Sequence, residues 1–435
     1  MKVIRDPVHN IIYFDKDEEA VLLELIDTQE FQRLRHIKQL GLSPFTYPGA
    51  EHTRFAHSIG VTHLMKRFVN KICSLKEERF RQYINELNDY RKQLLAAALL
   101  HDVGHGPFSH ALEKTTEINH ERWTIEIIRG DTEVNSVLHK HGINPHEVAE
   151  IVQRTHTSKA VVKLLSSQLD TDRVDYLLRD SKLTGAGYGS FDLEWLINVL
   201  RIGEHNGEVE VGLDRNKGLS IAEDFVMARY YMYINVYFHK TTRSAELIVD
   251  KIFKRAMELF HDKQIDLPDD LIAVLECNGQ TDKALVHYIN LTDHTVWHYF
   301  YQWSKHSDPI LSDLSSRLLK RDFFKEVPMS EMYDMEMWTR ITNYFSNQDL
   351  LKNYYLAIDD AKSSSYKDSY ILQKPKTDEK EEEREASEYI LLFDHKGNGT
   401  ELSKVSDIIN SIRNKPISIR RLFMPKQYIE EIFGG

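Results

Sequence analysis

Residues 94–110, with the sequence LLAAALLHDVGHGPFSH, are the stretch around which the rest of the chain is organised. The first seven are apolar and predict one buried helical segment. His101 and Asp102 follow directly, and His105 comes one turn later, so the two imidazoles share a helix face if the helix continues that far. Burying an adjacent histidine and aspartate costs free energy unless a partner compensates them. A hydrogen-bonded pair of core residues would satisfy this condition, but several histidines near one aspartate favour a metal or catalytic site.

The composition is that of a globular protein. The chain has 435 residues, of which 41% are hydrophobic and 10% aromatic, enough for one large domain with an appended one or for two to three domains. The net charge of -11 argues against broad nucleic-acid binding, although a local basic pocket remains compatible with it. Cys73 and Cys277 are far apart and form no CxxC pattern, which suits a reducing compartment. With no secretory signal at the N-terminus and no apolar run near the ~20 residues that span a bilayer, we expect a cytoplasmic protein without membrane contact.

Helix dominates the pattern of apolar residues up to about residue 330. A short hairpin is expected at residues 3–14, and a helix at 18–41 that breaks near Asp27 and ends at Gly41. A loop covers 43–50, and further helices are expected at 54–73, 85–102, from 119, and within 158–178. Asn206-Gly207 predicts the turn of a second hairpin within 200–213, and 221–260 has a helical period. These elements predict a mainly α fold with short β-hairpins.

The character of the chain changes after Val327. The segment up to Tyr370 is polar and helical in pattern, and 374–388 is a charge run that indicates a solvated linker or an exposed helix start. Residues 389–393 predict a strand, and the tail ends in an amphipathic helix over 425–435. We therefore expect a core over 1–330 and a C-terminal helical and small α+β region over 331–435.

Two further residues complete a candidate ligand set. His57 lies on the helix expected at 54–73, and Asp172 lies in the sequence LDTDRVDYLLRD. Together with His101 and Asp102 they give two imidazoles and two carboxylates, a set suited to Mg, Mn, Fe, Ni or Zn with positions left for water and phosphate. Spacing does not bring the three segments together, and a helical histidine taken alone is usually structural.

Other residues suit nucleotide binding. Asp172, Tyr176 and Asp180 are separated by one helical turn each, so they project from one face and line either a sugar-binding wall or an ordinary solvated surface. Arginines present paired donors to phosphate oxygens, although single arginines are mostly surface residues. The candidates are Arg54, Arg173 and Arg229.

The order H…HD…D is the signature of the HD-domain metal phosphohydrolases, and the chain carries all four letters. The segments DPVHN, EFQRLR, FTYPGAEHTRFAHSIGV, HDVGHGPFSH, DTDRVDYLLRD and YFHK resemble, collinearly from about residue 2 to 325, the deoxynucleoside triphosphate (dNTP) triphosphohydrolases. That family includes bacterial enzymes and the animal dNTPase that carries a sterile-alpha-motif domain. No such segment is recognised here, so we expect the bacterial form, with an HD-domain helical core that includes the N-terminal nucleotide-binding hairpin and helix.

The resemblance implies roles residue by residue. The implied metal ligands are His57, His101, Asp102 and Asp172. The implied catalytic cluster beside the α-phosphate is His105, His110, His120 and Glu113, with His110 as general acid toward O5′ and Glu113 in place of an aspartate of the animal enzyme. The implied substrate contacts are Gln39, Leu40, Arg54, Arg173, Tyr176, Asp180, Arg229 and Tyr237, of which Arg173 is a lysine in that relative. Water would attack the α-phosphorus and release a deoxynucleoside and triphosphate.

The resemblance also implies a second nucleotide site. Asp27, Gln32 and Arg35 match a guanine-reading triad, in which a carboxylate accepts from N1–H and N2–H while arginine donates to O6 and N7. The alternative is that these residues only decorate a surface helix. Further residues match positions that surround the activator nucleotide at subunit contacts in the family. They are Val3, Arg201, Arg215, Lys217, His239, Lys240, Arg321 and Lys325. Arg5 stands where the animal enzyme has asparagine, which leaves a second activator nucleotide open. This reading implies dGTP or GTP as activator and a homo-oligomer, a tetramer in the family.

Three classes of function therefore compete. The first is a dNTP triphosphohydrolase, and the second is an HD phosphohydrolase acting on a nucleoside monophosphate or a cyclic nucleotide. The third is a nucleotide sensor or nucleic-acid-binding protein without turnover. The intact ligand set argues against loss of catalysis, and the acidic net charge makes nucleic-acid binding weak or absent. Release of triphosphate distinguishes the first class from the second.

Overall fold

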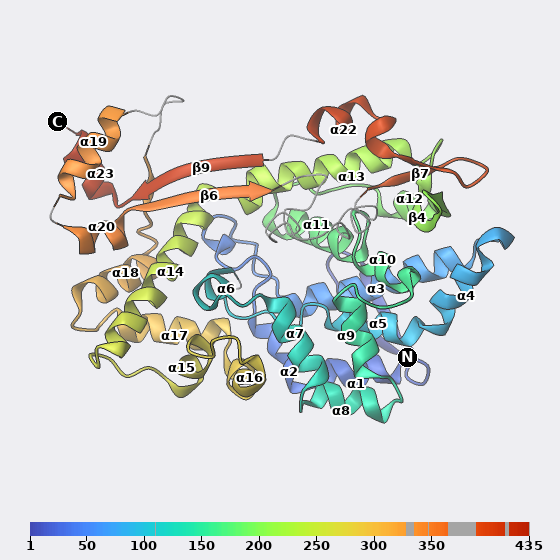
Figure 1. The fold of residues 1–435 in the computed structure, drawn as a ribbon, viewed down its shortest axis with the longest axis horizontal. Helices are drawn as coiled ribbons and strands as arrows, with labels where there is room; N and C mark the ends of the chain where they lie inside the picture. The colour runs from blue at the N-terminus through green and yellow to red at the C-terminus, as the bar shows by residue number, and fades with distance from the viewer. Residues whose placement is uncertain (109, 328–334, 347, 364–388, 414–416, 435) are drawn as a thin grey trace.

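The computed structural model describes the chain except for residues 109, 328–334, 347, 364–388, 414–416 and 435. The charge run predicted at 374–388 lies outside the described residues. The predicted mainly α fold is confirmed: helices form the body of the molecule, and three small sheets join them within the described ranges (Figure 1).

The first half of the chain is helical after one hairpin. Its helices are α1 (Ala20–Asp27), α2 (Gln29–Gln32), the 3-10 turns η1 (Arg33–His36) and η2 (Ser43–Phe45), α3 (Arg54–Cys73), η3 (Glu78–Phe80), α4 (Arg81–Asp89), α5 (Arg91–Leu100), α6 (His110–Thr116), α7 (His120–Arg129), α8 (Glu133–Lys140), α9 (Pro145–Val152), α10 (Lys159–Leu165), α11 (Thr171–Thr184) and α12 (Leu193–Asn198). The second half contains α13 (Leu219–Met232), the π-helical turn η4 (Tyr233–Tyr237), α14 (Lys240–His261), α15 (Asp269–Leu275), α16 (Thr281–Asn290), α17 (Asp293–Trp303), α18 (Pro309–Lys320), α19 (Met335–Tyr344), α20 (Asp349–Tyr355), the 3-10 turn η7 (Leu402–Lys404), α22 (Asp407–Ile412) and α23 (Lys426–Phe433).

Helix α5 is the centre of the hydrophobic core. Its seven C-terminal residues are at most 4% exposed, because an all-apolar segment can be covered on every side. Helix α3 packs against both α5 and α11. Helix α11 begins at Asp170, whose carboxylate accepts a hydrogen bond from the backbone N–H of Arg173 at 2.7 Å, and ends at Gly185 with a φ of 71°. This cap fixes Asp172 in the first turn, against the start of α3.

The strands form three sheets within the described residues. Strands β1 (Lys2–Asp6) and β2 (Asn10–Phe14) make the predicted N-terminal hairpin. The second sheet has the order β3 (Leu200–His205), β4 (Glu208–Asp214), β7 (Leu391–Phe393) and β8 (Gly399–Glu401). The third has the order β5 (Lys325–Glu326), β9 (Ile417–Met424) and β6 (Ala357–Ser363). Positive φ angles at Asn206 (51°) and Gly207 (81°) give the turn predicted between β3 and β4.

The C-terminal region closes against the core. In Figure 1, β6 and β9 run side by side as a long ribbon, and α19, α20 and α23 lie together at one end of it. Ile390, Leu392 and Phe423 belong to the same buried apolar cluster as α3 and α5. The division of the chain near residue 330 stays a prediction. No helix among the described residues is both long and apolar enough to cross a membrane.

Several sequence predictions differ from the structure, and the continuous helical period expected over 221–260 is divided into α13, η4 and α14. The helix expected up to Gly41 ends at His36, because Lys38 pairs with Thr53 and the Gln39 N–H donates to the His52 carbonyl. Helix α5 ends at Leu100 and residues 101–104 form a turn, so His101 and His105 do not share a helix face.

A further difference is strand β6, where the sequence favoured a polar helix. It pairs with β9, and Asp359 on it is buried through an ion pair with Arg243 on α14. A strand whose partner lies about 60 positions away carries little local signal.

Candidate metal centre

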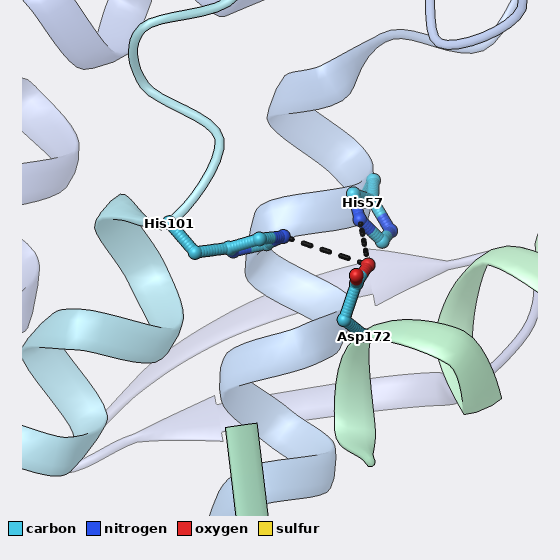
Figure 2. A group of neighbouring side chains, drawn as sticks. All are labelled: His57, His101 and Asp172. Atoms are coloured by element: carbon cyan, nitrogen blue, oxygen red, sulfur yellow. Dashed lines mark hydrogen bonds and ion pairs between the residues drawn. The ribbon is translucent and has the colours of Figure 1, made fainter. Parts of the chain in front are cut away.

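His57, His101 and Asp172 converge from three elements (Figure 2). His57 lies in the first turns of α3, His101 in the turn after α5, and Asp172 in the first turn of α11. One ligand atom of each residue lies within 4.8 Å of the others. The Asp172 Oδ1 is 3.0 Å from Nε2 of His57 and 3.6 Å from Nε2 of His101. The structure therefore brings together residues that span more than a hundred positions.

Asp102 joins the same group. Its carboxylate oxygens lie 3.7 Å from Nε2 of His57 and 3.6 Å from Nε2 of His101. Arg54, one turn before His57, pairs with the same carboxylate. Although burial alone raises it, the pKa of Asp102 is held well below its usual range by Arg54, His105 and His101. Asp102 is thus a buried anion.

The two histidines are oriented by their other ring nitrogens. Nδ1 of His101 lies 2.9 Å from the carbonyl of Ala98 and donates to it, which leaves Nε2 as the ring nitrogen that a cation can bind. Nδ1 of His57 lies 2.8 Å from Asp175, which is completely buried. Such hydrogen bonds are the usual way in which a protein fixes the tautomer of a metal-binding histidine.

Asp175 is a member of the site that sequence reasoning missed. Besides His57 it binds His9 at 2.6 Å and Arg179 at 2.8 Å, and Arg179 reaches Asp6 at 2.8 Å. The signal was the spacing of carboxylates in DTDRVDYLLRD, where Asp175 lies one turn after Asp172.

The donor set fits a divalent cation. Nε2 of His101 is buried without a hydrogen bond among the described residues, yet it faces two carboxylates. Burial alone would lower the pKa of His57, but Asp172 and Asp175 raise it to about 10. Without a cation the His57 ring therefore holds a second proton between two carboxylates, and a cation bound by His57, His101, Asp102 and Asp172 would replace that proton.

A second cluster adjoins the first. Nε2 of His105 is 3.2 Å from Asp102, and the His105 ring stacks on that of His120 with centroids 3.7 Å apart. His120 also binds Glu113 at 2.8 Å. Burial, followed by the nearby Arg54 and His120, lowers the pKa of His105 well below its usual value, so this ring is neutral. His110 begins α6, and its side chain lies outside the described part of the structure.

The remaining candidate arginines contact one loop. Arg173 hydrogen-bonds to the Ser167 carbonyl and pairs with Asp170, while Arg229 donates to Gln168 at 2.9 Å. Both guanidinium groups are therefore held at the loop that precedes α11.

The residues of the candidate sugar-binding wall, Tyr176, Asp180 and Tyr237, lie next to one another. Asp180 accepts from Tyr237 at 2.9 Å and binds His52 at 2.7 Å, and the Tyr237 ring lies 6.2 Å from that of Tyr176. His52, which sequence reasoning also left without a role, accepts the Gln39 N–H through its carbonyl at 3.0 Å. Leu40 follows Gln39 and packs half-buried against the core.

The candidate activator residues fall into three groups on one chain. In the first, exposed Val3 lies on β1 beside Lys2, whose Nζ is 3.9 Å from Asp27, and Arg35 donates to Gln32 at 2.7 Å. The second lies around Asp214 and contains Arg201, Arg215 and Lys217. The third surrounds a cleft of about 240 Å³ that is lined by Lys240, Arg321 and Lys325 and adjoined by His239.

Two family models match the chain: the HD domain over residues 54–180 and the HD associated region over residues 191–433. The chain belongs to the HD-domain family. All four candidate metal ligands lie inside the HD domain, whereas Tyr237 and Arg229 lie in the associated region.

Similar proteins agree with this assignment. An uncharacterized protein of Bacillus subtilis, YwfO, is 39% identical over 98% of this chain and 93% of its own length. Human deoxynucleoside triphosphate triphosphohydrolase SAMHD1 is 27% identical over 75% of this chain, and the match spans 55% of that protein. A crystal structure of a phosphohydrolase from Bacteroides thetaiotaomicron superposes with a TM-score of 0.76 at 27% identity, covering 98% of this chain and 99% of that one.

Proposed function

We propose that the protein is a metal-dependent dNTP triphosphohydrolase that a guanine nucleotide activates. The observation that carries this proposal is the juxtaposition of two clusters: the ligand set His57, His101, Asp102 and Asp172, and the histidine cluster that touches it through Asp102. The similarity to proteins named as dNTP triphosphohydrolases supports the choice of substrate.

Each cluster has a separate task in this reaction. A divalent cation would supply Lewis-acid polarisation of phosphate oxygens and a water of lowered pKa. Arg54 at this site neutralises charge on the phosphate oxygens as they approach, with Arg173 and Arg229 beside the neighbouring loop. His110 protonates the departing O5′, and His105, His120 and Glu113 support it.

The wall made by Tyr176, Asp180 and Tyr237 selects deoxyribose. The Asp180 carboxylate, which already accepts from the Tyr237 hydroxyl, offers a further acceptor site to a 3′-hydroxyl, so an analogue that lacks this group loses that hydrogen bond. A Tyr176 ring packed under C2′ would exclude a 2′-hydroxyl. Discrimination between dATP and ATP is therefore expected at this wall.

Activation would depend on assembly. The three groups of activator residues come from different segments of one chain, and in this proposal the activator contacts all of them by binding between subunits of a homo-oligomer. Binding only to the assembled form then shifts the equilibrium toward the oligomer.

Product analysis tests the proposal. Purified protein is incubated with Mn²⁺ or Mg²⁺ and each dNTP, with and without dGTP, and phosphorus products are identified by ³¹P NMR. We expect inorganic triphosphate and a deoxynucleoside, with ATP left intact. Release of pyrophosphate, or hydrolysis confined to monophosphates or cyclic nucleotides, would contradict the proposal and favour another HD phosphohydrolase activity.

A further inference from the structure

Arg33 is a buried arginine that connects η1 to the loop carrying the centre. It is 5% exposed, and its guanidinium donates to three backbone carbonyls. These belong to Leu291 at 3.0 Å, Val103 at 3.3 Å and His105 at 2.8 Å. Two of the three lie in the turn that follows His101 and Asp102.

The partners of Arg33 are unusual for a buried cation. Among the described residues no carboxylate forms an ion pair with its guanidinium, which lies 5.0 Å from the ring of Tyr288, and Asp293 and Glu30 attract it only at longer range. Burying a guanidinium without a directly paired carboxylate costs free energy, and burial lowers the pKa of Arg33, so a gain in stability does not explain this residue. The planar fork, however, can hold three acceptors from two segments in one geometry.

We propose that Arg33 is a positioning residue: through its hydrogen bonds to Val103 and His105 it holds the loop that presents His101, Asp102 and His105 to the metal centre. The inference rests on the proposed function in assigning that loop to the reaction. Its test does not require turnover, because the geometry of the loop also sets metal affinity.

Neighbouring contacts also hold this loop. The Tyr288 hydroxyl donates to the Gly104 carbonyl at 2.6 Å, and its ring stacks on Trp123 at 3.9 Å. A Cβ at Gly104 would lie 2.1 Å from the backbone nitrogen of Thr124. The loop is thus fixed between α7 and the start of η1, with little freedom to adjust if one hydrogen bond is lost.

Arg33 also lies within the candidate activator segment. Gln32 and Arg35 flank it, and the Arg35 guanidinium lies 3.5 Å over the ring of Phe55, next to Arg54 on α3. A nucleotide bound by Gln32 and Arg35 would therefore act on the turn whose buried arginine holds the loop.

The first experiment compares Mn²⁺ binding to metal-free protein by isothermal titration. Arg33→Lys keeps a cation but replaces the fork by one ammonium, so we expect the affinity for Mn²⁺ to fall by roughly tenfold or more. Arg255→Lys is the matched control. Arg255 lies on α14, and its guanidinium also makes two hydrogen bonds, both to the carboxylate of Asp308. This variant should bind Mn²⁺ as the parent does. Urea unfolding of both variants measures their stability. If Arg33 had only a structural role, Arg33→Lys would lower the free energy of unfolding without changing the affinity for Mn²⁺.

A second variant keeps the inference testable if Arg33→Lys does not fold. Tyr288→Phe removes only the hydroxyl bound to Gly104 and keeps the stacked ring, and it should weaken Mn²⁺ binding in the same direction. Parental Mn²⁺ affinity in the folded variants would overturn the inference. If both variants bind Mn²⁺ more weakly than the parent, but the parent hydrolyses no dNTP, the proposed function is refuted and the role of Arg33 stands.

Discussion

His101 shows how a single side chain is prepared for a cation. One nitrogen donates to the carbonyl of Ala98, and the other is buried facing Asp102 and Asp172. That second nitrogen makes no hydrogen bond among the described residues, and a buried polar atom without a hydrogen bond is costly in a core. The arrangement is therefore better explained as one that a cation completes than as a hydrogen-bonded pair of core residues.

Removing the two adjacent ligands tests this directly. We expect His101→Ala combined with Asp102→Ala to abolish bound metal and dNTP turnover while the helical fold is kept, because α5 ends before both residues. Metal analysis, circular dichroism and product assays check the three parts. His146→Ala, which changes an exposed histidine on α9, is the control and should retain both metal and turnover. Hydrolysis that persists in the double variant would refute the site.

His63 predicts a pH dependence of stability. It lies on α3 with its ring 5.2 Å from that of His9, and burial, then His9 and Arg67, lower its pKa to about 4. A base whose pKa is lowered by folding contributes full stability above its unfolded pKa of about 6.5 and loses it as pH falls toward 4. Because the ring is partly exposed, we expect about 1–2 kcal/mol of this loss at pH 4.5. Urea unfolding at pH 7.5 and 4.5 should show that His63→Gln loses less stability than the parent by this amount; equal losses would contradict the pKa shift.

The contact between β3 and β7 joins the C-terminal region to the hairpin of β3 and β4. A Cβ at Gly203 on β3 would lie 2.1 Å from the ring of Phe393 on β7, which is 2% exposed. Gly203→Ala should therefore lower the free energy of unfolding by about 1–3 kcal/mol through overpacking. Phe393→Ala in the same chain removes the clash, so the double variant should lose less than the sum of the single losses. Additive losses, measured by urea unfolding, would show that the ring does not pack on Gly203.

Local signals predicted some elements well and others not at all. Helix α3 has the bounds that its periodicity predicted, and the Asn206-Gly207 turn formed because both residues tolerate a positive φ. Helix α5 stops earlier than expected, because the loop after it is held by carbonyl contacts from Arg33 and Tyr288 rather than by its own sequence. Strand β6 could not be predicted, since only its pairing with β9 makes an extended conformation favourable.

The motifs predicted the candidate metal ligands but did not predict the residues that orient those ligands. The order H…HD…D placed His57, Asp102 and Asp172 in one site, and their convergence is a property of the whole fold. Asp175 and His9, by contrast, are 166 positions apart, and neither has a spacing that predicts the other. The residues that orient the ligands have hydrogen-bond partners far away in the sequence. A single sequence therefore shows which side chains are present but not which of them orient a ligand.

The proposed activation by a guanine nucleotide involves the whole molecule. Gln32 and Arg35, the residues around Asp214, and the cleft beside Arg321 are the three candidate groups on one chain, and the proposed activator would contact them by joining subunits. We expect the rate of dATP hydrolysis to depend sigmoidally on concentration, and dGTP to increase both the rate and the oligomeric mass in sedimentation. Arg321→Ala should weaken the response to dGTP while its Mn²⁺ affinity stays parental, since Arg321 lies outside the HD domain. Hyperbolic kinetics indifferent to dGTP, in a protein that stays monomeric, would remove the activator site and leave the metal centre unaffected.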